Sequence, residues 1–226
     1  MTDSESTPRA PIDDTLAAAL ARHDLNLPAD QMERLGKYCQ LLWDWNTKLN
    51  LTRHTDYEKF VGRDLVDSLQ LAAHLRSGEE ILDVGTGGGV PGVVLAIVRP
   101  DLQVALCDSV GKKARAVESM VKELGLEIPV FPFRAEELLE DTRYDALVIR
   151  AVGPLWKLLV AFKPHWHSIR RVLVIKGPKW TEELVEARRR GLMHNLQLKT
   201  AAEYAMPGAE GKSVVLKIWP KNVPER

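Results

Sequence analysis

The spacing of the hydrophobic residues divides the chain into two parts. In the first part apolar residues recur every three or four positions, as at Leu35, Cys39 and Leu42, which is the spacing of one face of an amphipathic helix. The pattern predicts helices over residues 13–24, 29–48 and 56–75. We therefore interpret residues 12–77 as a helical N-terminal extension and the polar residues 1–11 as a disordered tail.

In the second part, short apolar runs alternate with amphipathic stretches. The expected strands are residues 80–84, 103–107, 129–133, 144–150, 171–176, 196–202 and 213–219. The expected helices are residues 91–98, 111–124, 135–140, 154–163 and 181–192. Such alternation is typical of an α/β protein with a doubly wound, mostly parallel sheet. The last two strands are joined by a link too short for a parallel crossover, which predicts a terminal antiparallel strand.

A glycine-rich turn follows the first of these strands. The strand ends at Asp83-Val84, and glycines follow at positions 85, 87 and 89 before the next helix. Glycine lets the backbone adopt a positive φ and approach a ligand closely. A strand, a glycine-rich turn and a helix N-terminus at the edge of a parallel sheet together predict a nucleotide-like ligand site.

Two ligands fit this turn. Gly87-x-Gly89-x-x-Gly92 matches the dinucleotide fingerprint, which is weak evidence on its own. The longer pattern Asp83-x-Gly85-x-Gly87-x-Gly89 resembles the first motif of Rossmann-like methyltransferases that use S-adenosylmethionine. An acid is unfavourable beside a pyrophosphate and suits a ligand that carries an ammonium and a sulfonium group. A third interpretation is a helix-entry loop that binds no ligand.

Polar residues after the next two strands extend the candidate site. Asp108 follows the second strand, where a carboxylate can accept hydrogen bonds from both hydroxyls of a ribose. It could instead cap the helix that begins near Gly111. Glu136 follows the third strand, where an acid can contact an adenine, or can interact with the dipole of its own helix.

The fourth strand ends at Arg150, where the methyl acceptor of such an enzyme would lie. Methyltransferases that act on exocyclic amines commonly carry an Asn/Asp-Pro-Pro-aromatic element there, and this chain has none. A guanidinium suits a phosphate or a purine O6 and cannot remove a proton. This favours an acceptor with a free lone pair, such as guanine N7. Alternatively, Arg150 is a structural partner of Asp108 or Asp145.

Composition narrows the setting without naming a partner. The 31 Lys+Arg and 31 Asp+Glu residues balance, so overall charge neither predicts nor excludes nucleic-acid binding. Two cysteines, Cys39 and Cys107, both in apolar runs, indicate neither a metal site nor a disulfide framework and favour a reducing compartment. No apolar run reaches 18 residues, so we expect no membrane span. We expect a cytoplasmic protein without a metal.

Several motifs in a fixed order resemble one family. They are Asp83-Val-Gly-Thr-Gly-Gly-Gly-Val-Pro-Gly92, Val98-Arg-Pro100, Asp108-Ser-Val-Gly-Lys-Lys113, Arg150-Ala151 and Ile175-Lys-Gly177, preceded by Asn50-Leu51-Thr52 and by Arg63 with Asp67-Ser68-Leu69. Over roughly residues 30 to 220 the chain resembles the bacterial small-subunit ribosomal RNA guanine-N7 methyltransferases of the glucose-inhibited division protein B family. Plain Rossmann-like methyltransferases lack the Gly-x-Pro-Gly and Asp-Ser-x-Gly-Lys elements.

The resemblance implies a Rossmann-like class I methyltransferase domain over residues 78–226 that uses S-adenosylmethionine to methylate one guanine in the decoding region of 16S rRNA. The candidate cofactor-binding residues are Asp83, Gly85, Thr86, Gly87, Gly89, Val90, Asp108, Ala135, Glu136 and Arg150. Partners are then 16S rRNA or the small ribosomal subunit, and we expect a monomer. The chain departs from the family's usual residues at Asp64, Ile149 and Lys212-Ser213, which weakens RNA contacts assigned to positions 64 and 212–213.

The expected chemistry is an in-line displacement in which guanine N7 attacks the methyl carbon. The enzyme mainly positions the reactants. Arg150 orients the base and Lys176, at the end of the fifth strand, contacts phosphate or purine. The candidate RNA-binding residues are Arg53, His54, Arg63, Lys112, Lys113, Arg115 and Lys179. The alternatives are a dinucleotide-binding oxidoreductase and a non-catalytic rRNA-binding protein.

Overall fold

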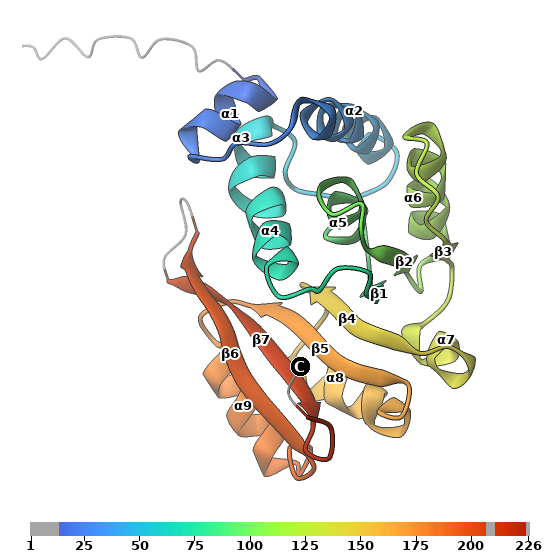
Figure 1. Ribbon diagram of the computed structural model, residues 1–226, viewed down its shortest axis with the longest axis vertical. Coiled ribbons are helices and arrows are strands. Elements are labelled where there is room, and N and C mark those ends of the chain that lie inside the picture. Colours follow the sequence, from blue (N-terminus) through green and yellow to red (C-terminus); the bar gives the residue numbers. More distant parts are fainter. Residues whose placement is uncertain (1–13, 207–210, 225–226) are drawn as a thin grey trace, which may run out of the picture.

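The computed structural model describes residues 14–206 and 211–224, so the expected tail, residues 1–11, lies outside the described residues. Within these ranges seven strands form one sheet in the order β3-β2-β1-β4-β5-β7-β6 (Figure 1). The strands are Glu80–Val84 (β1), Gln103–Cys107 (β2), Val130–Phe131 (β3), Tyr144–Arg150 (β4), Ile169–Lys176 (β5), Leu196–Ala205 (β6) and Lys212–Pro220 (β7). The α/β class and the mostly parallel sheet are confirmed.

The C-terminal hairpin closes the sheet. Strands β1 to β5 pair in parallel, whereas β7 pairs antiparallel with both β5 and β6. The last strand of the chain therefore lies between β5 and the edge strand β6. This is the antiparallel strand that the short link between the last two strands predicts, since a hairpin can only join antiparallel neighbours.

Helices cover both faces of the sheet. They are Leu16–Arg22 (α1), Ala29–Asn46 (α2), Tyr57–Lys59 (α3), Phe60–Leu65 (η1), Val66–Ala72 (α4), Gly92–Val98 (α5), Gly111–Glu123 (α6), Ala135–Asp141 (α7), Leu155–Phe162 (α8), Lys163–His165 (η2) and Trp180–Arg189 (α9). The N-terminal helices, α5 and α6 lie on one side, and α7, α8 and α9 on the other (Figure 1).

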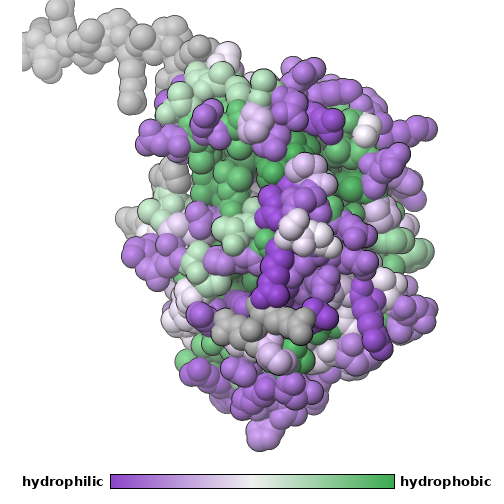
Figure 2. Space-filling model, in the orientation of Figure 1, coloured by the Kyte–Doolittle hydropathy of each residue, from purple (hydrophilic) through white to green (hydrophobic). Residues whose placement is uncertain are grey.

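The alternation of side chains along each strand supplies both cores. In β1, Ile81 belongs to the core shared with the N-terminal helices, α5 and α6, whereas Leu82 belongs to the core under α7, α8 and α9. Hydrophilic residues dominate the face of the molecule seen in Figure 2, and hydrophobic residues are visible there mainly between the helices of the upper half. The strands β1, β2, β4, β5 and β7 are therefore buried on both faces, as their near-continuous apolar runs require, whereas the edge strand β6 is largely exposed.

Two elements differ from the sequence predictions. The helix expected over residues 56–75 is divided into α3, the π-helix η1 and α4. A π-turn places an extra residue in the helix, and the spacing of apolar residues does not reveal it. Strand β3 spans two residues instead of the expected five. Pro129 and Pro132 flank it, and proline has no N–H to donate to a neighbouring strand.

A buried ion pair joins the N-terminal extension to the sheet. Arg171 on β5 is 5% exposed and binds both carboxylate oxygens of Glu79, with Nη1 donating to Oε1 at 2.9 Å. Its Nη2 also donates to the carbonyl oxygen of His74, just after α4, at 3.0 Å. The guanidinium thus links the end of the extension, the start of β1 and β5.

We expect the Glu79→Gln variant to lose about 3 kcal/mol of unfolding free energy, because an unpaired guanidinium would remain buried. Urea unfolding followed by circular dichroism measures the change. The neighbouring Glu80 is exposed, so Glu80→Gln is a matched control that we expect to change stability by less than ~0.5 kcal/mol. Equal stabilities for the two variants would contradict the assigned role of the pair.

Candidate functional site

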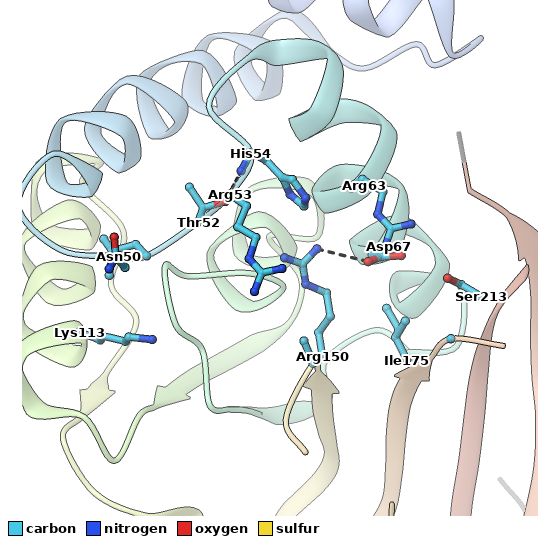
Figure 3. A pocket seen from close by; sticks show the side chains of 13 residues that line it. Asn50, Thr52, Arg53, His54, Arg63, Asp67, Lys113, Arg150, Ile175 and Ser213 are labelled. Atoms are coloured by element: carbon cyan, nitrogen blue, oxygen red, sulfur yellow. Dashed lines mark hydrogen bonds and ion pairs between the residues drawn. The ribbon is translucent and has the colours of Figure 1, made fainter. Parts of the chain in front are cut away.

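Two cavities adjoin the carboxyl ends of the parallel strands. The large cavity has a volume of about 890 Å³, and the small cavity about 240 Å³. The large cavity is lined by Asn50, Leu51, Thr52, Arg53, His54, Arg63, Asp67, Lys113, Arg150, Ala151, Ile175, Gly177 and Ser213 (Figure 3). The small cavity is lined by Val84, Gly85, Cys107, Asp108, Ser109, Phe133, Arg134, Ala135, Glu136, Val152, Gly153, Lys157, Leu158, Ala161 and Phe162.

One segment connects the cavities. Arg150 and Ala151, at the end of β4, line the large cavity, and the next two residues, Val152 and Gly153, line the small one. A ligand in the small cavity and a ligand in the large cavity would therefore lie on either side of the β4 exit. This is the edge of the sheet where ligands of open α/β folds bind.

The carboxylate of Asp83 holds the glycine-rich turn together from beneath. Asp83 is fully buried, and its Oδ2 accepts hydrogen bonds from Thr86 Oγ1 at 2.6 Å and from the Gly92 N–H at 2.8 Å. The expectation that this acid faces a ligand's ammonium group is therefore corrected. Asp83 lies beneath the turn and fixes its two ends, and Thr86 is buried with it.

Burial raises the pKa of Asp83 to about 6, although the hydrogen bonds from Thr86 and Gly92 oppose the shift. In an unfolded chain an aspartate has a pKa of about 4. Between these values the folded protein binds a proton that the unfolded chain lacks. Stability from this group therefore falls as pH rises, by ~1.4 kcal/mol per pH unit at most.

The Asp83→Asn variant tests this pH dependence, because asparagine does not titrate. We expect the unfolding free energy of the variant, relative to that of the parent protein, to increase by about 2 kcal/mol between pH 4 and pH 6. Urea unfolding of both proteins at pH 4, 5, 6 and 7 gives the difference, in which the other titrating groups cancel. A difference that does not change with pH would show that Asp83 is not a buried, titrating carboxyl.

The N-terminal extension supports the other side of the turn. The Tyr38 hydroxyl donates to the carbonyl oxygen of Gly88 at 2.8 Å. A Cβ built on Gly88 would lie 2.8 Å from Leu42 Cδ1 and 3.4 Å from Leu51 Cβ, so helix α2 and the loop after it pack directly on the turn. The extension is thus part of the site rather than a separate appendage.

Four of the predicted cofactor-binding residues line the small cavity: Gly85, Asp108, Ala135 and Glu136. Gly85 has a φ of 72°, and a Cβ there would lie 2.6 Å from Val152 Cγ2, so only glycine fits. Thr86, Gly87, Gly89 and Val90 are absent from the linings of both cavities described above and shape the turn from within.

The carboxylate of Asp108 joins β2 to the turn. Its Oδ2 accepts from the Gly87 N–H at 2.9 Å, and its Oδ1 accepts from the N–H of Val110, the residue before α6, at 2.8 Å. The N-cap of α6 is Val110, and no side-chain hydrogen bond caps this helix, so the helix-capping alternative is wrong and Asp108 instead fixes the loop before the helix. Asp108 nevertheless lines the small cavity, so its contact with a ribose stays a prediction.

The sequence analysis missed several residues of the small cavity. Phe133 is 47% exposed, an unusual fraction for a phenylalanine, and lies on the cavity wall with Ala135. Cys107 lies there too, and burial raises the pKa of its thiol to about 12. The position of Phe133 at the end of an expected strand was a usable signal, whereas Lys157 and Leu158 reach the cavity from α8, which no motif indicated.

Arg150 is paired with two carboxylates from the N-terminal extension. Its Nη1 lies 2.6 Å from Asp64 Oδ1 and 3.2 Å from Asp67 Oδ2. Asp64 is fully buried, and Asp67 also accepts from the Tyr204 hydroxyl at 2.7 Å. The structural partners suggested from the sequence, Asp108 and Asp145, are therefore wrong. The partners are Asp64 on η1 and Asp67 on α4.

The cluster of Arg150, Asp64 and Asp67 contains charges of both signs. Burial alone would lower the pKa of Arg150, but the carboxylates of Asp64 and Asp67 outweigh it and raise the pKa above its ordinary value. Burial raises the pKa of Asp67, against the opposing effect of Arg150. The guanidinium therefore stays charged, and Nη1 makes its contacts with both Asp64 and Asp67.

Lys176 does not face the large cavity. Its Nζ donates to the carbonyl oxygen of Gly153 at 2.7 Å and lies 2.8 Å from Glu183 Oε2 on α9, and the residue is only 7% exposed. The expected contact of Lys176 with phosphate or purine is therefore corrected. Since Glu183 also accepts from the Leu155 N–H at 2.6 Å, these contacts hold the segment between β4 and α8 in place.

The predicted RNA-binding residues separate into two groups. Arg53, His54, Arg63 and Lys113 line the large cavity, and Figure 3 shows their side chains around the same space as Arg150. The remaining three, Lys112, Arg115 and Lys179, are exposed and lie outside that lining. The large cavity therefore carries a local excess of cations, although the chain as a whole is neutral.

Within residues 14–206 and 211–224, no three His, Cys, Asp or Glu side chains gather as a metal site would require. Among the same residues, no helix is long and apolar enough to cross a bilayer. Cys39 and Cys107 are both buried and free.

The fold and the glycine-rich site define a Rossmann-like methyltransferase architecture. The chain is similar in fold to M. capricolum TrmK, whose structure was solved with S-adenosyl-homocysteine (TM-score 0.54, 16% identity, 70% of each chain). It is also similar to a SAM-dependent O-methyltransferase from Thermotoga maritima (TM-score 0.51, 19% identity, 82% of this chain and 72% of that one). At such identities the likeness concerns the fold alone.

The sequence comparisons identify the family. Residues 31–209 match the family described as rRNA small subunit methyltransferase G, so the chain belongs to that family. It is 47% identical to Ribosomal RNA small subunit methyltransferase G from Rhodopirellula baltica, covering 86% of this chain and 84% of the relative. It is 37% identical to the protein of the same name from Halorhodospira halophila, covering 76% and 81%. The resemblance drawn from the motifs is confirmed.

Proposed function

We propose that this chain transfers a methyl group from S-adenosylmethionine to N7 of one guanine in the decoding region of 16S rRNA. The observation that carries the proposal is the pair of cavities on either side of the β4 exit, with Arg150 between them. Membership of the rRNA small subunit methyltransferase G family supports it and disfavours a dinucleotide-dependent oxidoreductase.

The small cavity suits the adenosine part of the cofactor. Gly85 provides a surface without a side chain, Asp108 provides a carboxylate for the ribose, and Ala135 and Glu136 lie where the adenine would be read. Both Asp108 oxygens already accept one backbone hydrogen bond each, and each retains a lone pair for a hydroxyl. When bound, the cofactor supplies an electrophilic methyl group on a sulfonium centre.

The large cavity suits an acceptor that needs no base. The carboxylates of Asp64 and Asp67 are held by Arg150, His54 and Tyr204 rather than directed freely into the cavity. Guanine N7 carries its own lone pair, so no residue has to remove a proton. The contribution of the protein is then to hold the base, and positioning of this kind can be worth roughly 7–11 kcal/mol.

Basic residues around the large cavity suit the RNA backbone. Arg53, Arg63 and Lys113 line it and can neutralise phosphates near the target base. Binding through such contacts weakens as salt concentration rises, because releasing the RNA's condensed counterions into a more concentrated solution gains less entropy. We further propose that the protein acts as a monomer in the cytoplasm and without a metal ion.

Transfer of a labelled methyl group tests the proposal. The purified protein is incubated with S-adenosylmethionine carrying a tritiated methyl group and with small ribosomal subunits from cells lacking this protein, and the RNA is then digested to nucleosides. We expect the label in 7-methylguanosine from 16S rRNA. Tight binding of subunits without any transfer would establish instead a non-catalytic rRNA-binding protein, and label on another nucleoside would refute the N7 assignment.

A further inference from the structure

The imidazole of His54 forms part of the wall of the large cavity and is held there rigidly. Its backbone N–H donates to Thr52 Oγ1 at 3.0 Å, and its carbonyl oxygen accepts from Trp43 Nε1 at 2.8 Å. The same loop is fixed by Asn46, whose Oδ1 accepts from the N–H groups of Leu51 and Thr52. The side chain is 25% exposed, so one part of the ring remains accessible.

Asp64 fixes the hydrogen positions of this ring. Its Oδ1 lies 2.8 Å from His54 Nδ1 and 2.6 Å from Arg150 Nη1. A carboxylate oxygen that contacts a guanidinium can only accept, so Nδ1 must carry a hydrogen. In the uncharged imidazole, Nε2 on the other side of the ring then carries a lone pair. Because one oxygen atom binds both groups, the imidazole and the guanidinium lie side by side.

From this arrangement we infer that His54 and Arg150 together recognise guanine: Arg150 donates to O6 and His54 Nε2 accepts from N1–H. The inference deepens the proposed function and rests on it. N7, O6 and N1–H follow one another around the edge of guanine. Arg150 immediately precedes the residues that line the small cavity, and His54 meets Arg150 at the shared Asp64 oxygen, so the inference places the small cavity, Arg150 and His54 in the same order along the wall.

The same pair disfavours adenine, which also has an N7 lone pair. Adenine presents an amino donor where guanine has O6, and an acceptor where guanine has N1–H. Arg150 would then face a donor and His54 an acceptor, so both contacts would be mismatched. Neither residue reads the 2-amino group in this scheme, so inosine, which lacks it, should substitute for guanine.

Two substitutions separate the hydrogen bond to Asp64 from the contact with the base. In His54→Asn the amide can still donate to Asp64, but no acceptor reaches the cavity. In His54→Gln the longer side chain carries an acceptor to about the position of Nε2. Small subunits reconstituted with guanosine, inosine or adenosine at the methylated position are the substrates, and calorimetric titration with S-adenosylmethionine checks that each variant still binds the cofactor.

We expect the parent protein to use guanosine and inosine and to reject adenosine. We expect His54→Asn to lower kcat/KM for guanosine by roughly 10- to 100-fold with unchanged cofactor affinity, and His54→Gln to restore most of it. An undiminished rate and preference in His54→Asn would overturn the inference and leave the proposed function intact. A parent protein that methylates none of these subunits would overturn the proposed function itself.

A purely structural role for His54, without contact to the base, predicts a different result. If the imidazole only supports Asp64 and Arg150, His54→Asn keeps that hydrogen bond and the rate, whereas His54→Gln loses both. This reversed order of the two variants would also overturn the inference. Urea unfolding of both variants verifies that they fold before their rates are compared.

Discussion

The Arg150→Met variant is expected to lose about 3–5 kcal/mol of unfolding free energy and to lose methylation. The substitution leaves the carboxylates of Asp64 and Asp67 buried without their cation, and an uncompensated buried charge is among the costliest single changes in a protein. Methionine keeps the length of the side chain but offers no donor to a base. Urea unfolding measures the first effect and labelled methyl transfer the second.

A variant with three substitutions separates the two roles of Arg150. In Asp64→Asn, Asp67→Asn, Arg150→Met all three charges are gone, so we expect most of the lost stability to return. Methylation should stay absent, because the base still lacks its donor. If the triple variant regained both stability and activity, Arg150 would be only a structural cation and would not take part in methyl transfer.

The Gly92→Ala variant is expected to abolish cofactor binding and to cost about 2–3 kcal/mol of stability. A Cβ at this position would lie 2.1 Å from Leu106 Cδ2 and 2.7 Å from Asp83 Oδ2, far inside contact distance. The backbone must shift, and the shift breaks the hydrogen bond from the Gly92 N–H to Asp83 that closes the turn. Calorimetric titration with S-adenosylmethionine and urea unfolding measure the two effects.

Gly36 offers a matched control for this substitution. It lies inside helix α2, and the nearest atom to its Cβ position is Leu16 Cδ2 at 3.9 Å, an ordinary contact. Gly36→Ala should therefore keep cofactor binding and gain about 0.5–1 kcal/mol of stability, because alanine favours the helix. Cofactor affinity that is equally high in Gly92→Ala would contradict the assigned geometry of the turn.

The sequence predicted the fold well because its signals are local. Strand–helix alternation, the glycine-rich turn and the short link before the last strand all follow from the order of residues in the chain, and each corresponds to an element of the sheet. The exceptions have local physical causes that the hydrophobic pattern does not carry. A π-turn interrupts the helix around Asp64, and two prolines shorten β3.

The site was predicted less completely because its contacts are distant in sequence. Arg150 was found from its place at a strand end, but its partner Asp64 lies 86 positions earlier in the chain, and no spacing rule pairs them. Lys176 was expected in the site from the same strand-end argument. Its side chain instead binds Gly153, in the segment after β4, and Glu183 on α9. A position at a strand end predicts the region in which a side chain lies, whereas the packing around it determines which way the side chain points.

The helical extension gives the largest difference between expectation and structure. Its helices were expected to pack on the main domain, but Tyr38 from this part contacts the turn directly and His54 lines the large cavity. The methyltransferase domain alone therefore lacks one wall of the candidate site. Amphipathic spacing predicts that such helices are buried on one face but not which functional loop they cover.

Chemical scission of rRNA at 7-methylguanosine tests directly whether this protein methylates N7 of one guanine in 16S rRNA. Ribosomal RNA from cells with and without the gene is reduced with borohydride, cleaved with aniline, and mapped by primer extension along 16S rRNA. We expect one cleavage site in the decoding region that disappears without the gene, returns with the parent protein and stays absent with Arg150→Met. An identical cleavage pattern in both cells would contradict this expectation.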